Sequence, residues 1–144
     1  MSNKVNFYNG NVAWQFVDFP SINEETGTIK VIELGAQIDF EIKRIFYLSE
    51  LKNNASRGFH AHKDLKQFLF CVSGSFDLLL DNGNITQTYR MTPESPGVFI
   101  DGKVWRELHK FTEETVVMVL CDREYRFDIV VRDYELFKKN IGAI

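Results

Sequence analysis

Two of the chain's three histidines, His60 and His62, are separated by a single residue. Residues two apart in a β-strand point to the same face of the sheet, so both imidazoles are expected to face one space. An imidazole titrates near neutral pH and can therefore take up and return protons at pH 7. Neutral imidazoles are also common metal ligands. The pair thus predicts either an acid–base site or part of a metal site.

The residues after the pair extend this pattern with Gln67 and, further along, Gly74. If the chain turns and continues as a strand, Gln67, Leu69 and Cys71 share the interior with the histidines. The spacing resembles the first motif of the cupin family, in which His-x-His is followed by an acidic or amide residue and then by glycine. The match predicts that both histidines lie inside a β-barrel.

The other candidate ligands favour acid–base chemistry over a metal. Gln67 stands where cupin metal sites usually have a carboxylate, and Trp105 and Arg106 stand near the place of a later histidine. Two imidazoles, a neutral amide and a guanidinium form a poor site for a divalent cation. We therefore expect no metal. Two histidines in one pocket can divide their roles, because one positive charge disfavours protonation of the other, and that division suits enolisation next to a carbonyl. His109 lies three residues beyond Arg106 and is read as a surface or hydrogen-bonded histidine.

The elements that must position these residues are strands. Short apolar alternations with period two recur between turn signals, which is typical of a sandwich or barrel. The sequence Asp81-Asn82-Gly83 predicts a hairpin, and the most apolar run, Thr115 to Cys121, predicts a central strand. One helix is expected from Asp133 to Ile141, with Asp133 as its N-cap. The predicted strands are 29–33, 43–47, 67–72, 75–80, 84–89, 97–100, 104–109 and 115–121.

Length and composition set the class of protein. The chain has 144 residues and a net charge of −3, so we expect one domain over residues 1–144 and no nucleic-acid partner. No apolar run is long enough to span a membrane, and Met1 to Gly10 lacks a signal-peptide core, so we expect a cytoplasmic protein. Cys71 and Cys121 lie in apolar runs and are read as buried free thiols. The predicted fold is all-β: a cupin or jelly-roll β-barrel with a short C-terminal α-helix.

Four segments resemble one family, the WxcM-like sugar-nucleotide 3,4-ketoisomerases. They are RGFHAHKDL at 57–65, SGSF at 73–76, DNGN at 81–84 and FKK at 137–139. The resemblance covers roughly Phe16 to Ile141. It implies an isomerase that moves the keto group of dTDP-4-keto-6-deoxyglucose from C4 to C3 through an enediol, without metal or cofactor. It also implies a strand-exchanged homodimer and a place in deoxyamino-sugar and surface-polysaccharide synthesis.

By this resemblance His60 and His62 are the catalytic residues, although which of them acts on C3 stays open. Arg57 and Arg44 are candidates for the pyrophosphate, because a guanidinium suits phosphate oxygens; a structural salt bridge is the other reading of Arg57. Tyr47 either donates a hydrogen bond to the sugar or belongs to the core. The remaining candidates for substrate binding are Gln67, Trp105 and Arg106.

Three positions differ from the family pattern. Thr26 stands where the family has arginine, Phe46 where it has tyrosine, and Arg106 where it has histidine. These differences keep two other functions open: a sugar-nucleotide-binding cupin that has lost catalysis, and a 3- or 3,5-epimerase of the same substrate class.

Overall fold

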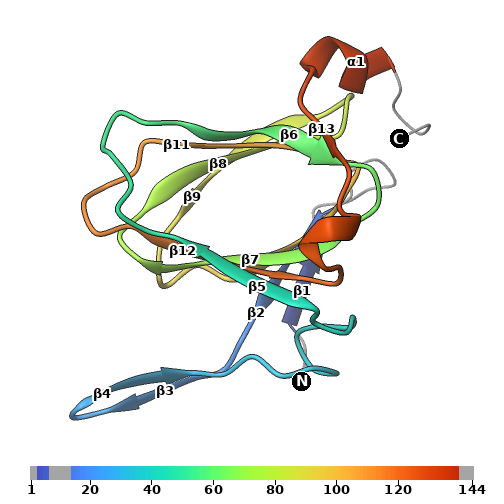
Figure 1. Ribbon diagram of the computed structural model, residues 1–144. Helices are drawn as coiled ribbons and strands as arrows, with labels where there is room; N and C mark the ends of the chain where they lie inside the picture. Colours follow the sequence, from blue (N-terminus) through green and yellow to red (C-terminus); the bar gives the residue numbers. More distant parts are fainter. Residues whose placement is uncertain (1–2, 7–13, 140–144) are drawn as a thin grey trace.

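The computed structural model describes residues 3–6 and 14–139, which form two antiparallel sheets that face each other (Figure 1). The larger sheet has the strand order β1 (Asn3–Asn6), β2 (Trp14–Asp18), β10 (Gly97–Asp101), β7 (Lys66–Ser73), β12 (Val116–Cys121) and β5 (Arg44–Leu48). The smaller sheet has the order β13 (Val130–Val131), β6 (Arg57–His62), β11 (Trp105–His109), β8 (Phe76–Asp81) and β9 (Thr86–Met91). This confirms the predicted all-β, cupin-type jelly roll; the two sheets do not close into a continuous barrel.

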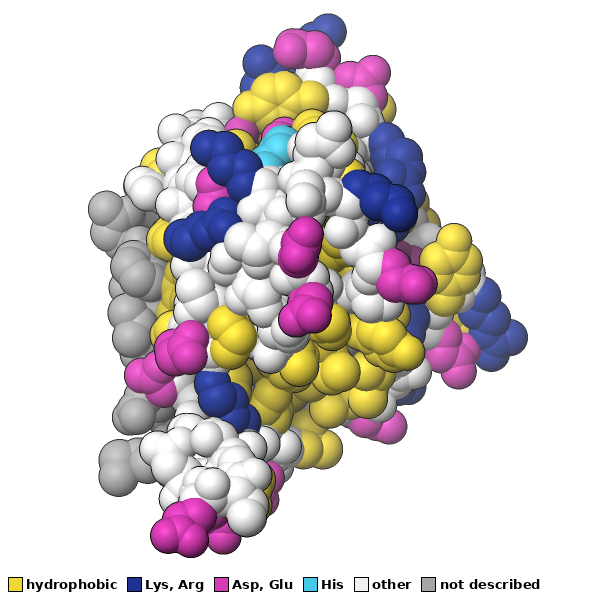
Figure 2. All heavy atoms as spheres, turned by 90° about the vertical axis from the view of Figure 1, so that its left-hand side faces the viewer, with side chains coloured by type: hydrophobic (Ala, Val, Ile, Leu, Met, Phe, Trp, Pro, Cys, Tyr) yellow, Lys and Arg dark blue, Asp and Glu magenta, His cyan; other side chains and the backbone are white. Residues whose placement is uncertain are grey.

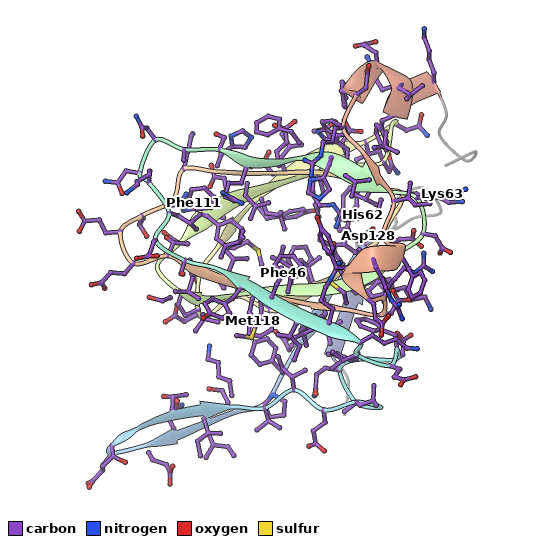
Figure 3. All side chains as sticks on the ribbon, viewed as in Figure 1. Phe46, His62, Lys63, Phe111, Met118 and Asp128 are labelled. Carbon is purple, nitrogen blue, oxygen red and sulfur yellow. The ribbon has the colours of Figure 1, made fainter. Side chains whose placement is uncertain are left out.

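The main core lies between the sheets, because strand alternation turns every second side chain inward. Leu78 and Leu80 of β8 face Leu69 of β7 and Val117 of β12, and all four are at most 4% exposed. The two predicted buried thiols, Cys71 and Cys121, are free and buried in the same core. Phe111 lies at the end of the interior opposite His62 (Figure 3).

A second apolar cluster covers part of the outer face of the larger sheet. Phe68 of β7 and Leu120 of β12 pack there against Ile38 and Phe40 from the segment that precedes β5. β12 is therefore buried on both faces, which explains why its sequence is continuously apolar rather than alternating. The predicted central strand is an interior strand, paired with β7 on one side and β5 on the other.

The C-terminal helix and the predicted hairpin are both present. α1 (Tyr134–Lys139) begins after Asp133, whose carboxylate accepts a hydrogen bond from the Leu136 amide at 3.0 Å, as expected of an N-cap. Ile141 lies outside the described residues. β8 and β9 pair around Asn82, whose side chain accepts from the amides of Asn84 and Ile85 at 2.8 Å. No helix among the described residues is long and apolar enough to span a bilayer.

A separate hairpin arm, formed by β3 (Ser21–Glu24) and β4 (Gly27–Lys30), projects from the body of the molecule (Figure 1). The prediction of a strand from 29 to 33 was wrong at its end, because β4 stops at Lys30. The reason is that β3, its only partner, begins at Ser21 and pairs with Lys30, and beyond it the Val31 amide bonds to the carbonyl of Pro20.

Candidate functional site

The histidine pair lines a cavity of about 300 Å³ between the two sheets, at the end opposite Phe111 (Figure 3). Strands of both sheets contribute to it, together with the segment that joins β12 to β13, which includes the 3-10 turn η1 (Tyr125–Phe127). The lining residues are Arg44, Phe46, His60, His62, Gln67, Tyr125, Asp128, Val130 and Arg132.

Strand register brings the polar residues together. In the larger sheet Cys121 is paired with Arg44 on β5 and with Gln67 on β7, so these three form a row across the inner face. In the smaller sheet His60 is opposite Arg106. Residues far apart in the sequence thus meet because opposed residues of neighbouring strands share a face.

A bulge in β6 aims the pair inward. Gly58 and Phe59 have positive φ values of 91° and 56°, and the register with β11 shifts at this point. A Cβ atom on Gly58 would lie 2.8 Å from the backbone oxygen of Arg106, so the close approach of the two strands requires glycine. The glycine of the RGFHAH segment therefore has a conformational role in placing His60.

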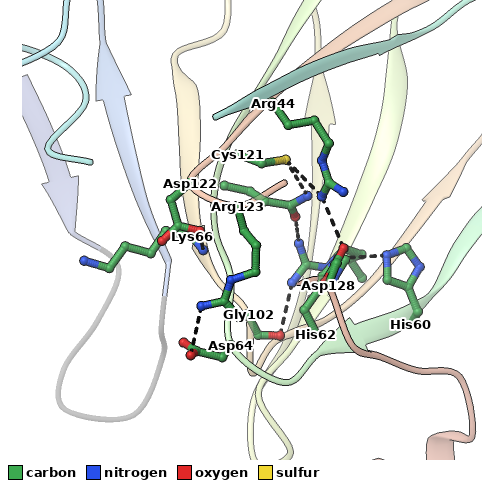
Figure 4. A network of polar contacts seen from close by, with 12 residues as sticks. Arg44, His60, His62, Asp64, Lys66, Gly102, Cys121, Asp122, Arg123 and Asp128 are labelled. Atoms are coloured by element: carbon green, nitrogen blue, oxygen red, sulfur yellow. Dashed lines mark hydrogen bonds and ion pairs between the residues drawn. The ribbon is translucent and has the colours of Figure 1, made fainter. Parts of the chain in front are cut away.

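The two imidazoles and Asp128 form a chain of hydrogen bonds (Figure 4). The Nε2 atoms of His60 and His62 are 3.1 Å apart, and His62 Nδ1 lies 2.8 Å from Asp128 Oδ1. Arg44 Nη2 donates to the other carboxylate oxygen of Asp128 at 3.2 Å and contacts the sulfur of Cys121 at 3.5 Å. Asp128 therefore links the relay to the arginine of the pocket wall.

The segment that carries Asp128 is fixed to the β6–β7 turn at three points. Asp122 accepts a hydrogen bond from the Lys66 amide at 3.0 Å, and Arg123 pairs with Asp64 at 3.1 Å (Figure 4). The Lys63 amide donates to the carbonyl of Ile129 at 2.8 Å, directly beside Asp128. These contacts position the carboxylate against His62.

Both histidines are neutral at pH 7. Burial lowers the pKa of His60 to about 4; a contact with the Gly58 carbonyl opposes burial, and the smaller effects of the positive charges of Arg106 and Arg132 add to it. Burial and then Arg106 lower the pKa of His62 to about 3, although its bond to Asp128 acts in the opposite direction. Burial alone would raise the pKa of Asp128, but the contacts with His62 and Arg44 bring it below its ordinary value. The site is thus a carboxylate behind two neutral imidazoles, which is suited to accept a proton.

Arg106 lies behind the pocket wall and is 3% exposed, so it does not line the cavity as predicted. Its guanidinium donates to the side-chain oxygen of Gln67 and to the carbonyls of Val104, Asp101 and Gly102 at 2.8, 3.3 and 3.4 Å. Gln67 does line the cavity, and its amide nitrogen contacts the Cys121 sulfur at 3.4 Å. The side chain of Arg106 is occupied by these buried contacts, so its placement gives no support to the predicted role in direct substrate binding.

Three other predicted residues are not brought to the cavity. Tyr47 follows Phe46 on β5 and therefore points outward, where it is 63% exposed. Trp105 points to the outer face of the smaller sheet, where it packs against Phe137 of α1 at a ring distance of 5.7 Å. Arg57 precedes the bulge and is exposed. Alternation within β5 and β11 explains why the side chains of Tyr47 and Trp105 point away from the cavity.

His109 lies away from the cavity, on the outer face of β11. Its ring nitrogens contact Ser56 at 2.7 Å and Glu107 at 2.8 Å, and Glu107 also accepts a bond from the Trp105 indole. It is the hydrogen-bonded histidine that the sequence analysis expected.

Sequence reasoning missed five lining residues: Phe46, Tyr125, Asp128, Val130 and Arg132. Alternation from Arg44 would have found Phe46, because residues two apart in β5 share the inner face. The other four lie in or directly after an irregular segment, where no period indicates which side chains point inward.

The donors around the pair do not converge on one point. Asp128 occupies the Nδ1 side of His62, whereas His60 faces its Nε2 side. Among the residues that the structure describes, no group of three or more His, Cys, Asp or Glu side chains is placed to hold a metal ion.

Comparison with known proteins gives consistent matches over most of the chain. A family model described as "FdtA: WxcM-like, C-terminal" matches residues 12–142. The TDP-4-oxo-6-deoxy-alpha-D-glucose-3,4-oxoisomerase of Aneurinibacillus thermoaerophilus is 38% identical over 128 residues, covering 89% of this chain and 92% of that protein.

Solved structures agree with this match. A mutant of the 3,4-ketoisomerase QdtA from Thermoanaerobacterium thermosaccharolyticum, in complex with TDP-4-keto-6-deoxyglucose, is 30% identical with a TM-score of 0.84, covering 94% of this chain and 97% of that one. A 3,4-ketoisomerase from Helicobacter canadensis is also 30% identical, with a TM-score of 0.85 over 91% and 98% of the two chains. The 3,5-epimerase RmlC of Legionella pneumophila is 10% identical with a TM-score of 0.72 over 87% and 73%, which is a likeness of fold alone.

Proposed function

The chain belongs to the WxcM-like family of sugar-nucleotide 3,4-ketoisomerases, and we propose that its reaction is carried by the His60–His62–Asp128 relay. The protein is an isomerase that converts a TDP-4-keto-6-deoxyhexose into its 3-keto isomer. The single observation that supports the assignment of roles is the uninterrupted chain of contacts from the carboxylate through both imidazoles (Figure 4).

The hydrogen bonds support one assignment of the base. Because a carboxylate only accepts, His62 carries its proton on Nδ1 and has a free electron pair on Nε2. His62 Nε2 then accepts the proton on His60 Nε2, so the electron pair of a neutral His60 is on Nδ1. That atom has no hydrogen-bond partner among the described residues, but it is buried, so the ring must turn for Nδ1 to reach the cavity. We propose that His60 Nδ1, exposed in this way when the substrate binds, removes the proton from C3 of the sugar.

The proton then has a path away from the base. When His60 Nδ1 binds the C3 proton, His60 becomes an imidazolium, and its Nε2 proton can move to His62 Nε2 over 3.1 Å. Asp128 stabilises the positive charge on His62. The C3–H electron pair forms the C3=C4 double bond, and the C4 oxygen gains a proton to give the enediol. Return of a proton to C4, with loss of the proton on the C3 oxygen, gives the 3-keto sugar without net gain or loss of atoms.

The cavity suits the sugar end of the substrate. Its volume of about 300 Å³ is at the lower end of the range for small-molecule sites, so the hexose fits inside while the nucleotide extends over the mouth. Arg44 and Arg132 line the cavity and offer guanidinium groups to the pyrophosphate. Tyr125 also lines it and is 81% exposed, which suits contact with the part of the substrate that protrudes.

Turnover of an authentic substrate tests the proposal. We expect ¹H NMR to follow conversion of TDP-4-keto-6-deoxyglucose to the 3-keto isomer, and His60→Asn to reduce kcat by about 10²- to 10⁴-fold, as removal of a catalytic base does. His109→Asn is the matched control, because that histidine lies outside the cavity and its loss should leave kcat unchanged. Conversion by His60→Asn at the wild-type rate would refute the role of His60.

The two other functions predict different results. An epimerase would exchange solvent deuterium into C3 or C5 while the keto group stays at C4. A binding protein without catalysis would retain the nucleotide in calorimetry and show no conversion. The intact relay favours an active enzyme over that second alternative.

A homodimer is supported by apolar surface that the single chain leaves open. All eight residues of the β3–β4 arm are exposed, and Ile22 and Ile29 face each other across it at 49% and 50% exposure. A two-stranded hairpin alone is marginally stable in water, so this arm needs a partner surface. Hydrophobic side chains also gather on the body beside the arm (Figure 2), where Phe70 and Val72 line a groove. We infer that a second copy covers both.

Light scattering after size-exclusion chromatography tests the dimer. We expect a mass twice that of the 16.8 kDa chain, and a shift to monomer for Ile22→Lys with Ile29→Lys. Leu136→Lys, at a residue of α1 that is 50% exposed, is the control and should stay dimeric. A wild-type mass of one chain at every concentration would refute the proposal. Location in the cytoplasm stays a prediction.

A further inference from the structure

The guanidinium of Arg106 is a buried cation whose hydrogen bonds all go to neutral groups. It contacts the Gln67 amide and the carbonyls of the β10–β11 turn, and no carboxylate among the described residues lies within ion-pair distance of it. Burial lowers its pKa to about 10, so it is still charged at pH 7. Its charge is only partly compensated, at a distance, by the carboxylates of Asp128 and Asp101. A buried charge of this kind is costly to keep and is often found at functional sites.

This cation lies close to the relay. Arg106 is the residue directly opposite His60 in the β6–β11 register. Its Nη2 atom donates to the Gly102 carbonyl, which also accepts the backbone amide of His62 at 2.8 Å. The guanidinium is thus tied to the backbone of one histidine and faces the other across the strands.

The charged groups around the pair come from four elements. Arg106 approaches from β11, Arg44 from β5 and Arg132 from the residue after β13, whereas Asp128 is the one carboxylate among the described residues that contacts the pair. Arg44 is already paired with Asp128. A carboxylate bonded to an imidazole favours the imidazolium form, so Asp128 and Arg106 act on the pair in opposite directions, and burial acts in the same direction as Arg106.

We propose that Arg106 is a positioning residue whose buried charge, in addition to burial, disfavours protonation of the His60–His62 pair against the attraction of Asp128. The catalytic consequence rests on the proposed isomerase function, but the charge effect itself does not. Gln67 takes part because its oxygen binds Arg106, which turns its amide nitrogen toward Cys121. Arg106 acts through these neighbours and does not touch the substrate.

The positive charge also suits the reaction that follows. Removal of the C3 proton places negative charge on the sugar oxygens, and a fixed cation in a buried site stabilises such charge without reorganisation. The same residue therefore disfavours protonation of the pair in the free site and favours the enediolate after the proton transfer.

NMR titration of the histidine rings in the folded protein without substrate tests the proposal. Arg106→Gln removes the charge, and we expect the pKa of His60 and of His62 to rise by about one unit or more, a tenfold change in proton affinity. Arg106→Lys keeps the charge with altered hydrogen bonds, and both pKa values should stay within about half a unit of wild type. If Arg106 has only a structural role, the pKa values of His60 and His62 should not differ between the two variants.

Gln67→Glu gives a second test, in case Arg106→Gln does not fold. It places a carboxylate on the same guanidinium and neutralises the charge without removing the side chain, so the pair should again titrate about one unit higher. His109 is an internal reference in every spectrum, and Arg90→Gln, at a 41% exposed side chain paired with Asp77, is the control that should change nothing. Unchanged pKa values of the pair in a folded Arg106→Gln or Gln67→Glu protein would overturn the proposal. Because no substrate is present, the result is independent of whether isomerisation is detected.

Discussion

Replacing Asp128 by asparagine is the most direct test of the relay, because it keeps the shape of the side chain and removes its charge. The carboxylate accepts from His62 at 2.8 Å and from Arg44 at 3.2 Å, and its side chain is only 7% exposed. An amide has one oxygen for these two donors. If the oxygen faces His62, the amide NH₂ is directed at Arg44, donor against donor. If it faces Arg44, the NH₂ is directed at His62 Nδ1.

The second orientation reverses the relay. His62 must then accept at Nδ1 and carry its proton on Nε2, His60 must accept at Nε2, and the proton of His60 moves to Nδ1, the atom assigned as the base. A hydrogen bond to a charged group contributes about 1.5–3 kcal/mol, or about 10- to 150-fold in rate. A wrong tautomer costs a Ser-His-Asp triad about 10⁴-fold. We therefore expect Asp128→Asn to reduce kcat by about 10²- to 10³-fold, between these two limits.

Initial rates of keto-group transfer, followed by ¹H NMR, measure this effect, with circular dichroism to check the fold. Asp77→Asn is the control, since Asp77 lies outside the cavity and pairs with Arg90 at 3.0 Å. Its kcat should change by no more than about twofold, as for other substitutions away from a site. A folded Asp128→Asn enzyme with a kcat within threefold of wild type would show that the relay does not set the tautomers.

Two further predictions concern stability. The folded-state pKa values of His60 and His62, about 4 and about 3, lie below the ordinary value of 6.5. At a pH between the folded-state value and 6.5, the unfolded chain therefore binds more protons than the folded chain. The free energy of unfolding consequently falls as the pH drops below 6.5. Urea unfolding at pH 4 to 8 should show this loss, roughly 3 kcal/mol for His60, and His60→Asn should flatten the curve; a flat wild-type curve contradicts the assignment. Phe137 is fully buried against Trp105, and Phe137→Ala should lower stability by about 3–5 kcal/mol in thermal unfolding, whereas Leu136→Ala on the exposed side should cost far less.

The fold and half of the site follow from local pattern in the sequence. Period-two alternation places His60 and His62 on the inner face of β6, and it places Gln67 with Leu69 and Cys71 on the inner face of β7 in the opposite sheet. The same rule excludes Trp105 and Tyr47 from the cavity, although resemblance alone had included them. Alternation is a property of the strand itself, so it was the safer guide at these positions.

The rest depends on contacts that no local pattern records. Asp128 reaches His62 only because the segment after β12 folds back onto the β6–β7 turn, across 66 residues of sequence. Arg106 points inward as alternation predicts, but its burial behind Gln67 depends on the packing of the β10–β11 turn. The direction of a strand residue can be predicted, but its depth behind neighbouring side chains cannot.

The segment that carries Asp128 also forms one wall of the cavity, through Tyr125 and Val130. Access of the substrate to the cavity and the basicity of His60 therefore depend on the same segment of the chain. Any displacement of the wall that separates Asp128 from His62 widens the entrance and, in the same movement, releases the tautomer that makes His60 a base. The contacts that hold this wall of the cavity in place are therefore the same contacts that complete the relay.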